Sequence, residues 1–279
     1  MNSNKVKPFL RWAGGKKWLV SLLAELVDID TYESYYEPFL GGGSVFFELH
    51  PKGKVFLSDT NEDLISTYKT VKTSPNEVWT ILSSYKNSES EYYAIREYEP
   101  IDPVERAARF IYLNQTSYNG LYRVNRDGKY NVPYGRRKNV PYNEAGILAC
   151  SQRLQNAVLT VDDFATVLQS VKKGDFIYLD PPYVVAKDVN GFIQYNKNLF
   201  SFDDQKRLSE SIDSIRNVGA YYVLSNAMHD TIKEIFQRES DSTFVLSRTS
   251  IIGGKKAYRG KTEEYLFTNI PGADKVFNR

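Results

Sequence analysis

Cysteine, histidine and long hydrophobic runs are scarce in this sequence, and each shortage excludes a class of protein. Cys150 is the only cysteine among 279 residues, so no internal disulfide framework can form and a reducing compartment is indicated. His50 and His229 are the only histidines, too few for a zinc site built from His and Cys, and we predict no metal. No run approaches the ~18 apolar residues of a membrane span, and residues 1–17 lack the apolar core of a signal peptide. We therefore expect a cytoplasmic protein with no membrane association.

A large excess of one charge is also lacking, because 36 Lys and Arg residues face 34 Asp and Glu residues. The basic residues are nevertheless concentrated in residues 104–140, where eight of them stand against two acids and are interleaved with five tyrosines. The eight are Arg106, Arg109, Arg123, Arg126, Lys129, Arg136, Arg137 and Lys138. Cations neutralise phosphates and flat rings stack on bases, so this mixture suits a nucleic-acid surface. A solvated basic face above packed tyrosines is the alternative interpretation.

Short apolar runs alternate with amphipathic stretches, which favours an α/β sheet covered by helices. Strands are predicted at 35–39, 54–59, 157–164, 174–180 and 220–226, with a closing hairpin formed by 243–251 and 263–269. Helices are predicted from Ser44, which we expect to cap the first, and over 203–217, begun by Ser201 and Asp204 and ended by Gly219. Residues 62–150 read as a mainly helical insertion after the second strand, which divides a core formed by 1–61 and 151–279. The loop 187–199 is expected to be disordered until its ligand is bound.

Glycines between a strand and a helix indicate a ligand near the backbone. Gly41-Gly42-Gly43 precede the first helix, and Asp59 ends the next strand, where a carboxylate can accept bonds from ribose hydroxyls. The spacing to the acid is about 16 residues, short of the ~20 of dinucleotide folds, which favours a nucleoside-like ligand over NAD. A plain glycine turn with an incidental Asp is the alternative. Ala13-Gly14-Gly15-Lys16 is not a P-loop, because Lys17 stands where Ser or Thr is required.

The strongest local motif is Asp180-Pro181-Pro182-Tyr183, directly after an apolar run. Ligands of open α/β sheets bind at the carboxyl ends of strands. The prolines have no N–H, so this backbone offers only acceptors, beside one carboxylate and one ring. Such a site suits an amino group on a flat ring that stacks on Tyr183, and two accepted hydrogen bonds favour a pyramidal nitrogen that can attack an electrophile. A structural proline turn is the alternative. Asp163-Phe164 after another strand is a weaker candidate for holding a cofactor adenine.

Taken together and in this order, the motifs resemble those of the Dam-type, D12-class family of adenine-N6 DNA methyltransferases. The resemblance is carried by Pro8 to Lys16, Glu37 to Gly43, Asp59 and Asp180 to Tyr183, and covers almost the whole chain. It implies S-adenosylmethionine as methyl donor and a Rossmann-like methyltransferase sheet with helices on both faces. It implies a cofactor-binding set of Trp12, Lys16, Phe39, Gly41, Gly43, Asp59, Asp163, Phe164 and Asp180. Asp180, Pro181 and Tyr183 are the implied catalytic residues.

The middle segment is similar to the target recognition domain of the same family, which implies double-stranded DNA as the partner and GATC as the site. Tyr118 is then the side chain inserted into the base stack and Arg123 the guanine reader, while Leu121 and Pro133 contact a thymine methyl group. Arg is the usual bidentate partner of guanine, and apolar groups discriminate thymine. The remaining expected DNA-binding residues are Arg109, Asn119, Asn125, Arg136, Arg137 and Lys138.

The expected reaction is base flipping followed by direct methyl transfer to adenine N6, with Cys150 uninvolved. The same acceptors also suit cytosine N4 or an RNA adenine. A further alternative, from another class, is a DNA-binding protein that keeps the cofactor fold without catalysis. A monomer is plausible, although the sequence leaves the oligomeric state open.

Overall fold

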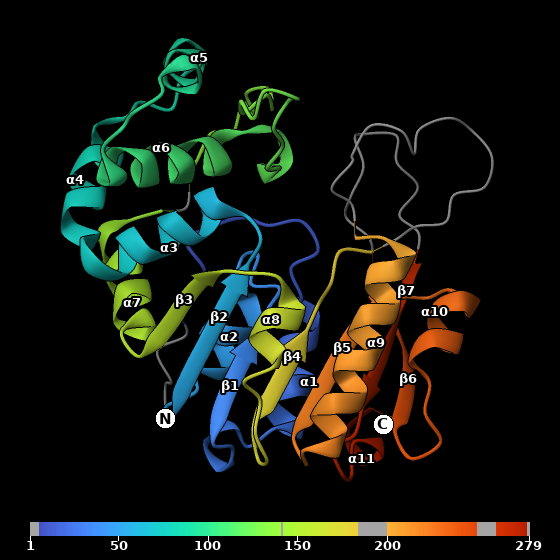
Figure 1. The fold of residues 1–279 in the computed structure, drawn as a ribbon. Coiled ribbons are helices and arrows are strands. Elements are labelled where there is room, and N and C mark those ends of the chain that lie inside the picture. The colour runs from blue at the N-terminus through green and yellow to red at the C-terminus, as the bar shows by residue number, and fades with distance from the viewer. Residues whose placement is uncertain (1–5, 141, 184–199, 250–260, 278–279) are drawn as a thin grey trace.

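The computed structural model describes residues 6–140, 142–183, 200–249 and 261–277, and the expected loop 187–199 lies outside this part of the chain. Its centre is one mixed sheet in the order β3-β2-β1-β4-β5-β7-β6 (Figure 1). The strands are β1 Ser34–Glu37, β2 Lys54–Asp59, β3 Ala157–Val161, β4 Phe176–Leu179, β5 Tyr221–Ala227, β6 Ser242–Thr249 and β7 Lys261–Thr268. The first five run parallel, and β7 is antiparallel to both its neighbours. The predicted strands and the closing hairpin are confirmed.

Helices cover both faces of the sheet because successive side chains of a strand point to opposite sides. Tyr35 and Phe176 face a core shared with α1 and α2, whereas Tyr36 and Ile177 face a second core under α8 and α9. On the first face lie α1 Lys17–Leu26, α2 Ser44–Leu49 and α11 Asp274–Phe277, with η1 Ile29–Thr31 before β1. On the second lie α8 Phe164–Leu168, α9 Phe202–Asn217 and α10 Asp230–Phe236. The order and the covering helices are those of the expected Rossmann-like methyltransferase sheet.

Local sequence explains where two of these helices begin and end. Ser201 and Asp204 form the predicted capping box of α9, and Gly219, with φ of 79°, ends that helix. The expected cap at Ser44 is wrong by one residue. Ser44 is the first helical residue of α2, and the N-cap is Gly43, whose φ of 64° favours glycine and which makes no side-chain cap bond.

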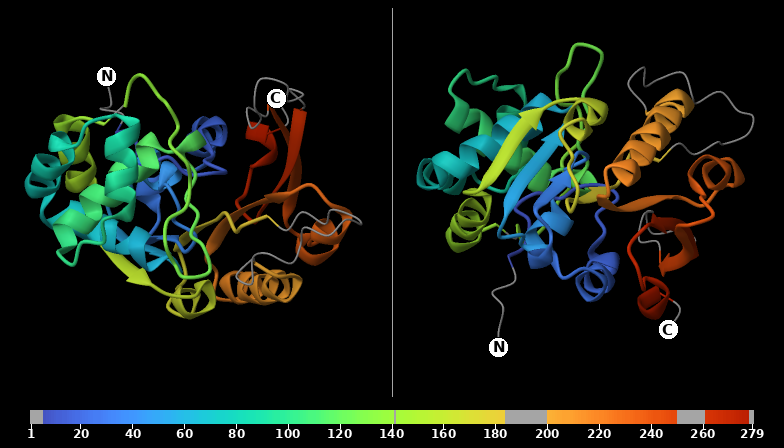
Figure 2. Two further views of the ribbon diagram at one scale, coloured as in Figure 1. Left: turned by 90° about the horizontal axis from the view of Figure 1, so that it is seen from above. Right: turned by 60° about the horizontal axis from the view of Figure 1, so that its bottom comes forward.

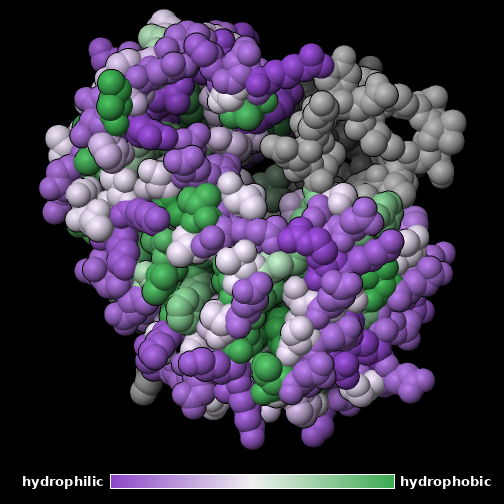
Figure 3. All heavy atoms as spheres, in the orientation of Figure 1, coloured by the Kyte–Doolittle hydropathy of each residue, from purple (hydrophilic) through white to green (hydrophobic). Residues whose placement is uncertain are grey.

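The chain leaves the sheet after β2 and returns at β3, as predicted, through a mainly helical insertion that lies above one end of the sheet (Figure 2). The insertion contains α3 Glu62–Thr73, α4 Pro75–Ser84, α5 Glu89–Glu97, α6 Pro103–Thr116, η2 Tyr118–Gly120 and α7 Glu144–Leu154. Its buried residues belong to the same core cluster as the first sheet face. A short hairpin, defined as residues 121–131 and closed by the bridge between Val124 and Tyr130, projects from it. Polar side chains dominate its outer surface (Figure 3).

The parallel strands end at one edge, the upper edge in Figure 1, toward which the hairpin of the insertion extends. The residues that follow β1, β2, β3 and β4 therefore meet at one place, which is where ligands bind in open α/β sheets. No helix in the described ranges is both long and apolar enough to cross a bilayer.

Candidate active site and DNA-recognition surface

Asp180 stands directly after β4, and its carboxylate pairs with a buried ammonium. Lys16, the residue before α1, is 2% exposed and places its Nζ 2.8 Å from Asp180 Oδ1. The same Nζ donates to the carbonyl of Gly14 at 3.1 Å, which orients the cation within its own turn. Two motifs far apart in the sequence, the one ending at Lys16 and the one beginning at Asp180, thus form a single charged pair at the edge of the sheet.

Tyr183 completes the site at the end of β4. Its hydroxyl donates to Glu264 Oε2 at 2.8 Å and lies 3.0 Å from Ser225 Oγ, while Lys16 Nζ sits 4.6 Å from its ring centre. Burial raises the pKa of Tyr183 far above its ordinary value, and the carboxylates of Asp180 and Glu264 add to that effect. The phenol is therefore neutral and its ring is held from two sides. Glu264 on β7 and Ser225 on β5 were missed by the sequence analysis.

The glycine turn after β1 is tied to the end of β2 through Asp59. The Asp59 carboxylate accepts from the backbone N–H of Gly41 and of Asn61, both at 3.0 Å. Burial raises the pKa of Asp59 while these two hydrogen bonds oppose the rise. A Cβ on Gly41, where φ is 47°, would lie 2.7 Å from the Trp12 ring. The turn thus needs glycine both for its backbone conformation and for the close approach of Trp12.

Trp12 connects this glycine turn to the insertion. Its ring stacks on Tyr122 of the hairpin, with centroids 5.6 Å apart and planes 22° from parallel. The backbone beside it is fixed as well, since Arg11 exchanges hydrogen bonds of 2.8 and 2.7 Å with the side chain of Asn114 at the end of α6. The expected cofactor residue Trp12 therefore also touches the expected recognition segment.

Three phenylalanine rings meet where β1 and β3 end. Phe39, Phe164 and Phe200 lie pairwise with centroids 5.4 to 5.5 Å apart. Asp163 caps α8 by accepting from Ala165 N at 2.9 Å and forms an ion pair of 2.6 Å with Arg207 of α9. The predicted pair Asp163 and Phe164 thus offers an apolar ring surface with a carboxylate at its rim.

The expected base-reading residues gather on one exposed surface of the insertion, which we call the recognition tip. It comprises Tyr118, Asn119, Leu121, Arg123, Asn125 and Pro133, all of them exposed. Two chain segments are brought together there by hydrogen bonds from Tyr118 N to Pro133 O and from Gly135 N to Thr116 O, both 2.8 Å. Tyr118 and Leu121 are 47% and 40% exposed, a large apolar surface for side chains of a folded protein.

Arg123 is oriented before any ligand arrives. Its Nε donates to Asn131 Oδ1 at 2.7 Å across the hairpin, and Asn131 N donates to the Arg123 carbonyl at 3.0 Å. The Asn125 side chain accepts from the backbone of Asp127 and Lys129 and fixes the hairpin turn. A guanidinium held at Nε keeps its terminal nitrogens as a fork for two acceptors.

The other basic residues of the segment do not form one uniform surface. Arg136 and Lys138 are exposed and Arg137 is half-buried, and Arg136 pairs with Glu89 at 3.3 Å. Arg109 differs, because its guanidinium donates to the carbonyls of Ile95 and Arg96 at 2.9 and 2.6 Å and so holds the end of α5. Composition grouped it with the DNA-facing residues, although these hydrogen bonds commit most of its guanidinium to the protein itself.

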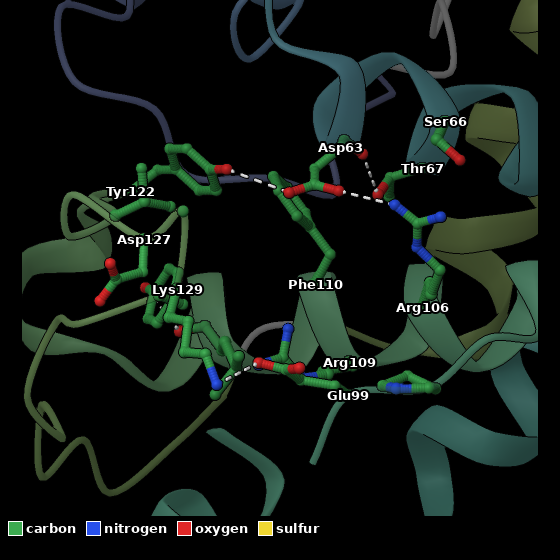
Figure 4. Close-up of a pocket in the computed structure, with 15 residues that line it drawn as sticks. Asp63, Ser66, Thr67, Glu99, Arg106, Arg109, Phe110, Tyr122, Asp127 and Lys129 are labelled. Atoms are coloured by element: carbon green, nitrogen blue, oxygen red, sulfur yellow. Dashed lines mark hydrogen bonds and ion pairs between the residues drawn. The ribbon is translucent and has the colours of Figure 1, made fainter. Parts of the chain in front are cut away.

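A cavity of about 330 Å³ lies beneath the hairpin, between α3 and α6 (Figure 4). Asp63 binds Arg106 at 2.9 Å and accepts from the Tyr122 hydroxyl at 3.2 Å, while Lys129 pairs with Glu99 at 3.1 Å on the opposite wall. These interactions join the hairpin to the helices. They lie within the insertion, away from the strand ends that carry Asp180.

The residues at the sheet edge fit S-adenosylmethionine by the chemistry of their groups. Its adenine suits the three rings and the rim carboxylate of Asp163, its ribose hydroxyls suit Asp59, and its sulfonium cation suits the carboxylates near Lys16. No cluster of three or more His, Cys, Asp or Glu side chains that could hold a metal ion occurs among the described residues.

Fold and site together define a Rossmann-like methyltransferase that carries a separate nucleic-acid-facing insertion. Residues 12–250 match the family of D12 class N6 adenine-specific DNA methyltransferases, and the chain belongs to that family. It is a DNA methyltransferase specific for adenine, and family and fold both imply S-adenosylmethionine as its methyl donor. The resemblance and the expected activity are confirmed.

Curated relatives of similar length support the assignment. The type II methyltransferase M1.LlaDCHI of Lactococcus lactis subsp. cremoris is 33% identical over 96% of this chain and 97% of that protein. M.MjaIII of Methanocaldococcus jannaschii is 39% identical over 80% and 85%, and the DNA adenine methylase of Escherichia coli K12 is 32% identical over 96% and 97%. An rRNA methylase structure from Streptococcus thermophilus aligns over 91% and 94% at 11% identity, with a TM-score of 0.36.

Proposed function

We propose that the enzyme flips an adenine out of a GATC site in double-stranded DNA and methylates it at N6 between Asp180 and Tyr183. The observation that carries this proposal is the meeting of Asp180, Lys16 and Tyr183 at the end of β4, on the side toward which the recognition tip extends. Flipping costs a few kcal/mol, which stacking on Tyr183 and two hydrogen bonds to the amino group offset in part. We expect the protein to act in the cytoplasm as a monomer.

Asp180 and the Pro181 carbonyl accept the two N6 hydrogens and direct the nitrogen lone pair away from the ring plane. Bound S-adenosylmethionine supplies a methyl group on a sulfonium, so the new N–C bond forms as the C–S bond breaks and its electron pair stays on sulfur. The amino group gains positive charge on the way, which strengthens its hydrogen bonds to the Asp180 carboxylate in the transition state. One N6 proton then leaves to solvent. Burial raises the pKa of Cys150 to about 12, which agrees with a bystander role for its thiol.

We assign cofactor binding to Trp12, Lys16, Asp59 and Asp163 with the rings and glycines around them, and DNA recognition to residues 62–150. Within that insertion, Arg123 reads a guanine, Tyr118 enters the base stack, and Leu121 and Pro133 meet a thymine methyl group. Their common exposure and the fixed Arg123 guanidinium support this division. The basic residues 136–138 are assigned to phosphates.

Replacement of the key carboxylate tests the mechanism. Asp180→Ala is expected to lower turnover at least about 100-fold while thermal unfolding and duplex binding persist. Asp203→Ala, at an exposed acid in the first turn of α9, is the matched control and should leave turnover unchanged. A folded Asp180→Ala enzyme with near-normal turnover would refute the mechanism.

The target base and sequence need a separate experiment. Transfer of a labelled methyl group to duplex DNA, single-stranded DNA and RNA, followed by nucleoside analysis, identifies the modified base. Label in N6-methyladenine from duplex DNA is the expected result, whereas label in N4-methylcytosine or in RNA would overturn it. Sequencing-based mapping of methylated adenines in cells expressing the protein should return GATC, and any other consensus would refute that part of the proposal.

A further inference from the structure

Glu264 on β7 is a buried carboxylate that the mechanism above does not use, yet it touches two residues of the site. It is 1% exposed, and its Oε2 accepts from the Tyr183 hydroxyl at 2.8 Å and lies 3.6 Å from Lys16 Nζ. Those two residues are also the neighbours of Asp180, which lies 2.8 Å from the same Nζ. One carboxylate therefore touches the ring and the cation on either side of the reactive acid.

The position of Glu264 is fixed by the sheet itself. The antiparallel register of β5 and β7 sets Ala227 opposite Glu264, and Ser225 of β5 approaches both Glu264 Oε2, at 3.4 Å, and the Tyr183 hydroxyl, at 3.0 Å. A charge-assisted bond from a phenol to a carboxylate is shorter and stronger than a neutral one. Because Glu264 and Ser225 lie on paired strands, this bond gives the Tyr183 ring a rigid support from behind.

We propose that Glu264 is a positioning residue for methyl transfer, which fixes the Tyr183 ring and gives Lys16 an acceptor other than Asp180. The inference rests on the proposed function, in which Asp180 accepts from adenine N6 and the base stacks on Tyr183. Without the Glu264 charge, Lys16 pairs more tightly with Asp180 and the ring loses its strongest hydrogen bond. Both changes displace the amino group from the line of attack, and a misplacement of about 1 Å can cost about 100-fold in rate.

Glu264→Gln tests the proposal, because the amide keeps the shape and removes the charge. We expect kcat to fall at least about tenfold, while the KM values for DNA and S-adenosylmethionine change less than about threefold. The matched control is Glu263→Gln, its neighbour on β7, which is exposed and accepts from Ser247. That variant should keep wild-type kcat. Thermal unfolding establishes that both variants are folded.

A double-mutant cycle with Tyr183→Phe separates positioning from a merely structural role. If Glu264 acts through the Tyr183 hydroxyl, the double variant loses less than the product of the two single losses. Losses that simply multiply, or an unchanged kcat in Glu264→Gln, would overturn the inference. Should Glu264→Gln fail to fold, Glu264→Asp enters the same cycle with the same expectation, since it draws the carboxylate back from Tyr183. A wild-type enzyme that transfers no methyl group to adenine would instead refute the proposed function.

Discussion

Glu37 at the end of β1 makes the stability of this enzyme depend on pH in an unusual direction. The side chain is 2% exposed, and its Oε2 accepts from the Tyr35 hydroxyl at 2.6 Å and from Phe46 N at 3.1 Å. Burial raises the pKa of Glu37 from 4.5 to about 8, partly opposed by the bond from Tyr35, while the Asp180 carboxylate adds to the rise. The folded protein therefore keeps this proton at neutral pH.

The direction of the effect follows from which state holds the proton. Between pH 4.5 and 8 the unfolded chain has lost the Glu37 proton and the folded chain retains it, so raising the pH favours the unfolded chain. The difference between the two pKa values corresponds to about 5 kcal/mol in total, of which about 3 kcal/mol is lost between pH 6 and pH 9. Above pH 8 the folded state carries the ionised, buried carboxylate and no further stability is lost through this group.

Glu37→Gln removes the titration while it keeps the shape of the side chain. Urea unfolding at pH 6 and pH 9 should show that the wild type loses about 3 kcal/mol more than the variant over this interval. Glu33→Gln, at an exposed acid just before the same strand, is the control and should follow the wild type. Parallel stability curves for wild type and Glu37→Gln would show that the buried carboxyl is not the titrating group.

Three further outcomes are expected. Arg123→Ala should cost about 1–3 kcal/mol of discrimination at one base pair in competition binding, and equal loss on all sequences would contradict base reading. Neutralising residues 136–138 to Gln should flatten the salt dependence of DNA binding, by about 0.9 in the log–log slope for each phosphate that is no longer neutralised; an unaltered slope refutes the assignment. Gly41→Ala should destabilise the fold by about 1–3 kcal/mol in urea, because φ is 47° and Trp12 lies where the methyl group would go, and wild-type stability would exclude that strain.

The sequence predicted the sheet well because most strands are short apolar runs bounded by glycines and acids. The insertion after β2 was visible as a change from strand-like to helical patterns, and Asp180, Tyr183 and Lys16 were found from their motifs. A motif names residues but not their partners. The ion pair between Lys16 and Asp180 joins segments 164 positions apart, and only the register of β4 against its neighbours brings them together.

Glu264 and Ser225 were missed for a related reason. Each is a single polar residue within an apolar strand, and the approach of one to the other depends on β5 pairing with β7, which reverses the parallel direction of the sheet. A carboxylate on the inward side of an otherwise apolar strand was the available signal, because such a group is rarely buried without a partner. Arg109 shows the opposite error, since charge counts do not reveal that a guanidinium already binds two carbonyl groups.

The segment from Phe9 to Lys16 has a structural consequence for how specificity can change. Gln115 and Asn114 of α6 bind its backbone at Phe9 and Arg11, Trp12 lies between the glycine turn and Tyr122, and Lys16 reaches Asp180. One stretch of chain therefore sets the distance between the recognition tip, the cofactor turn and the reactive carboxylate. Because the insertion also shares its hydrophobic core with the sheet, it is not a detachable module. A change of target sequence is accordingly easier to reach by substitutions at the exposed recognition tip than by exchange of residues 62–150 as a whole.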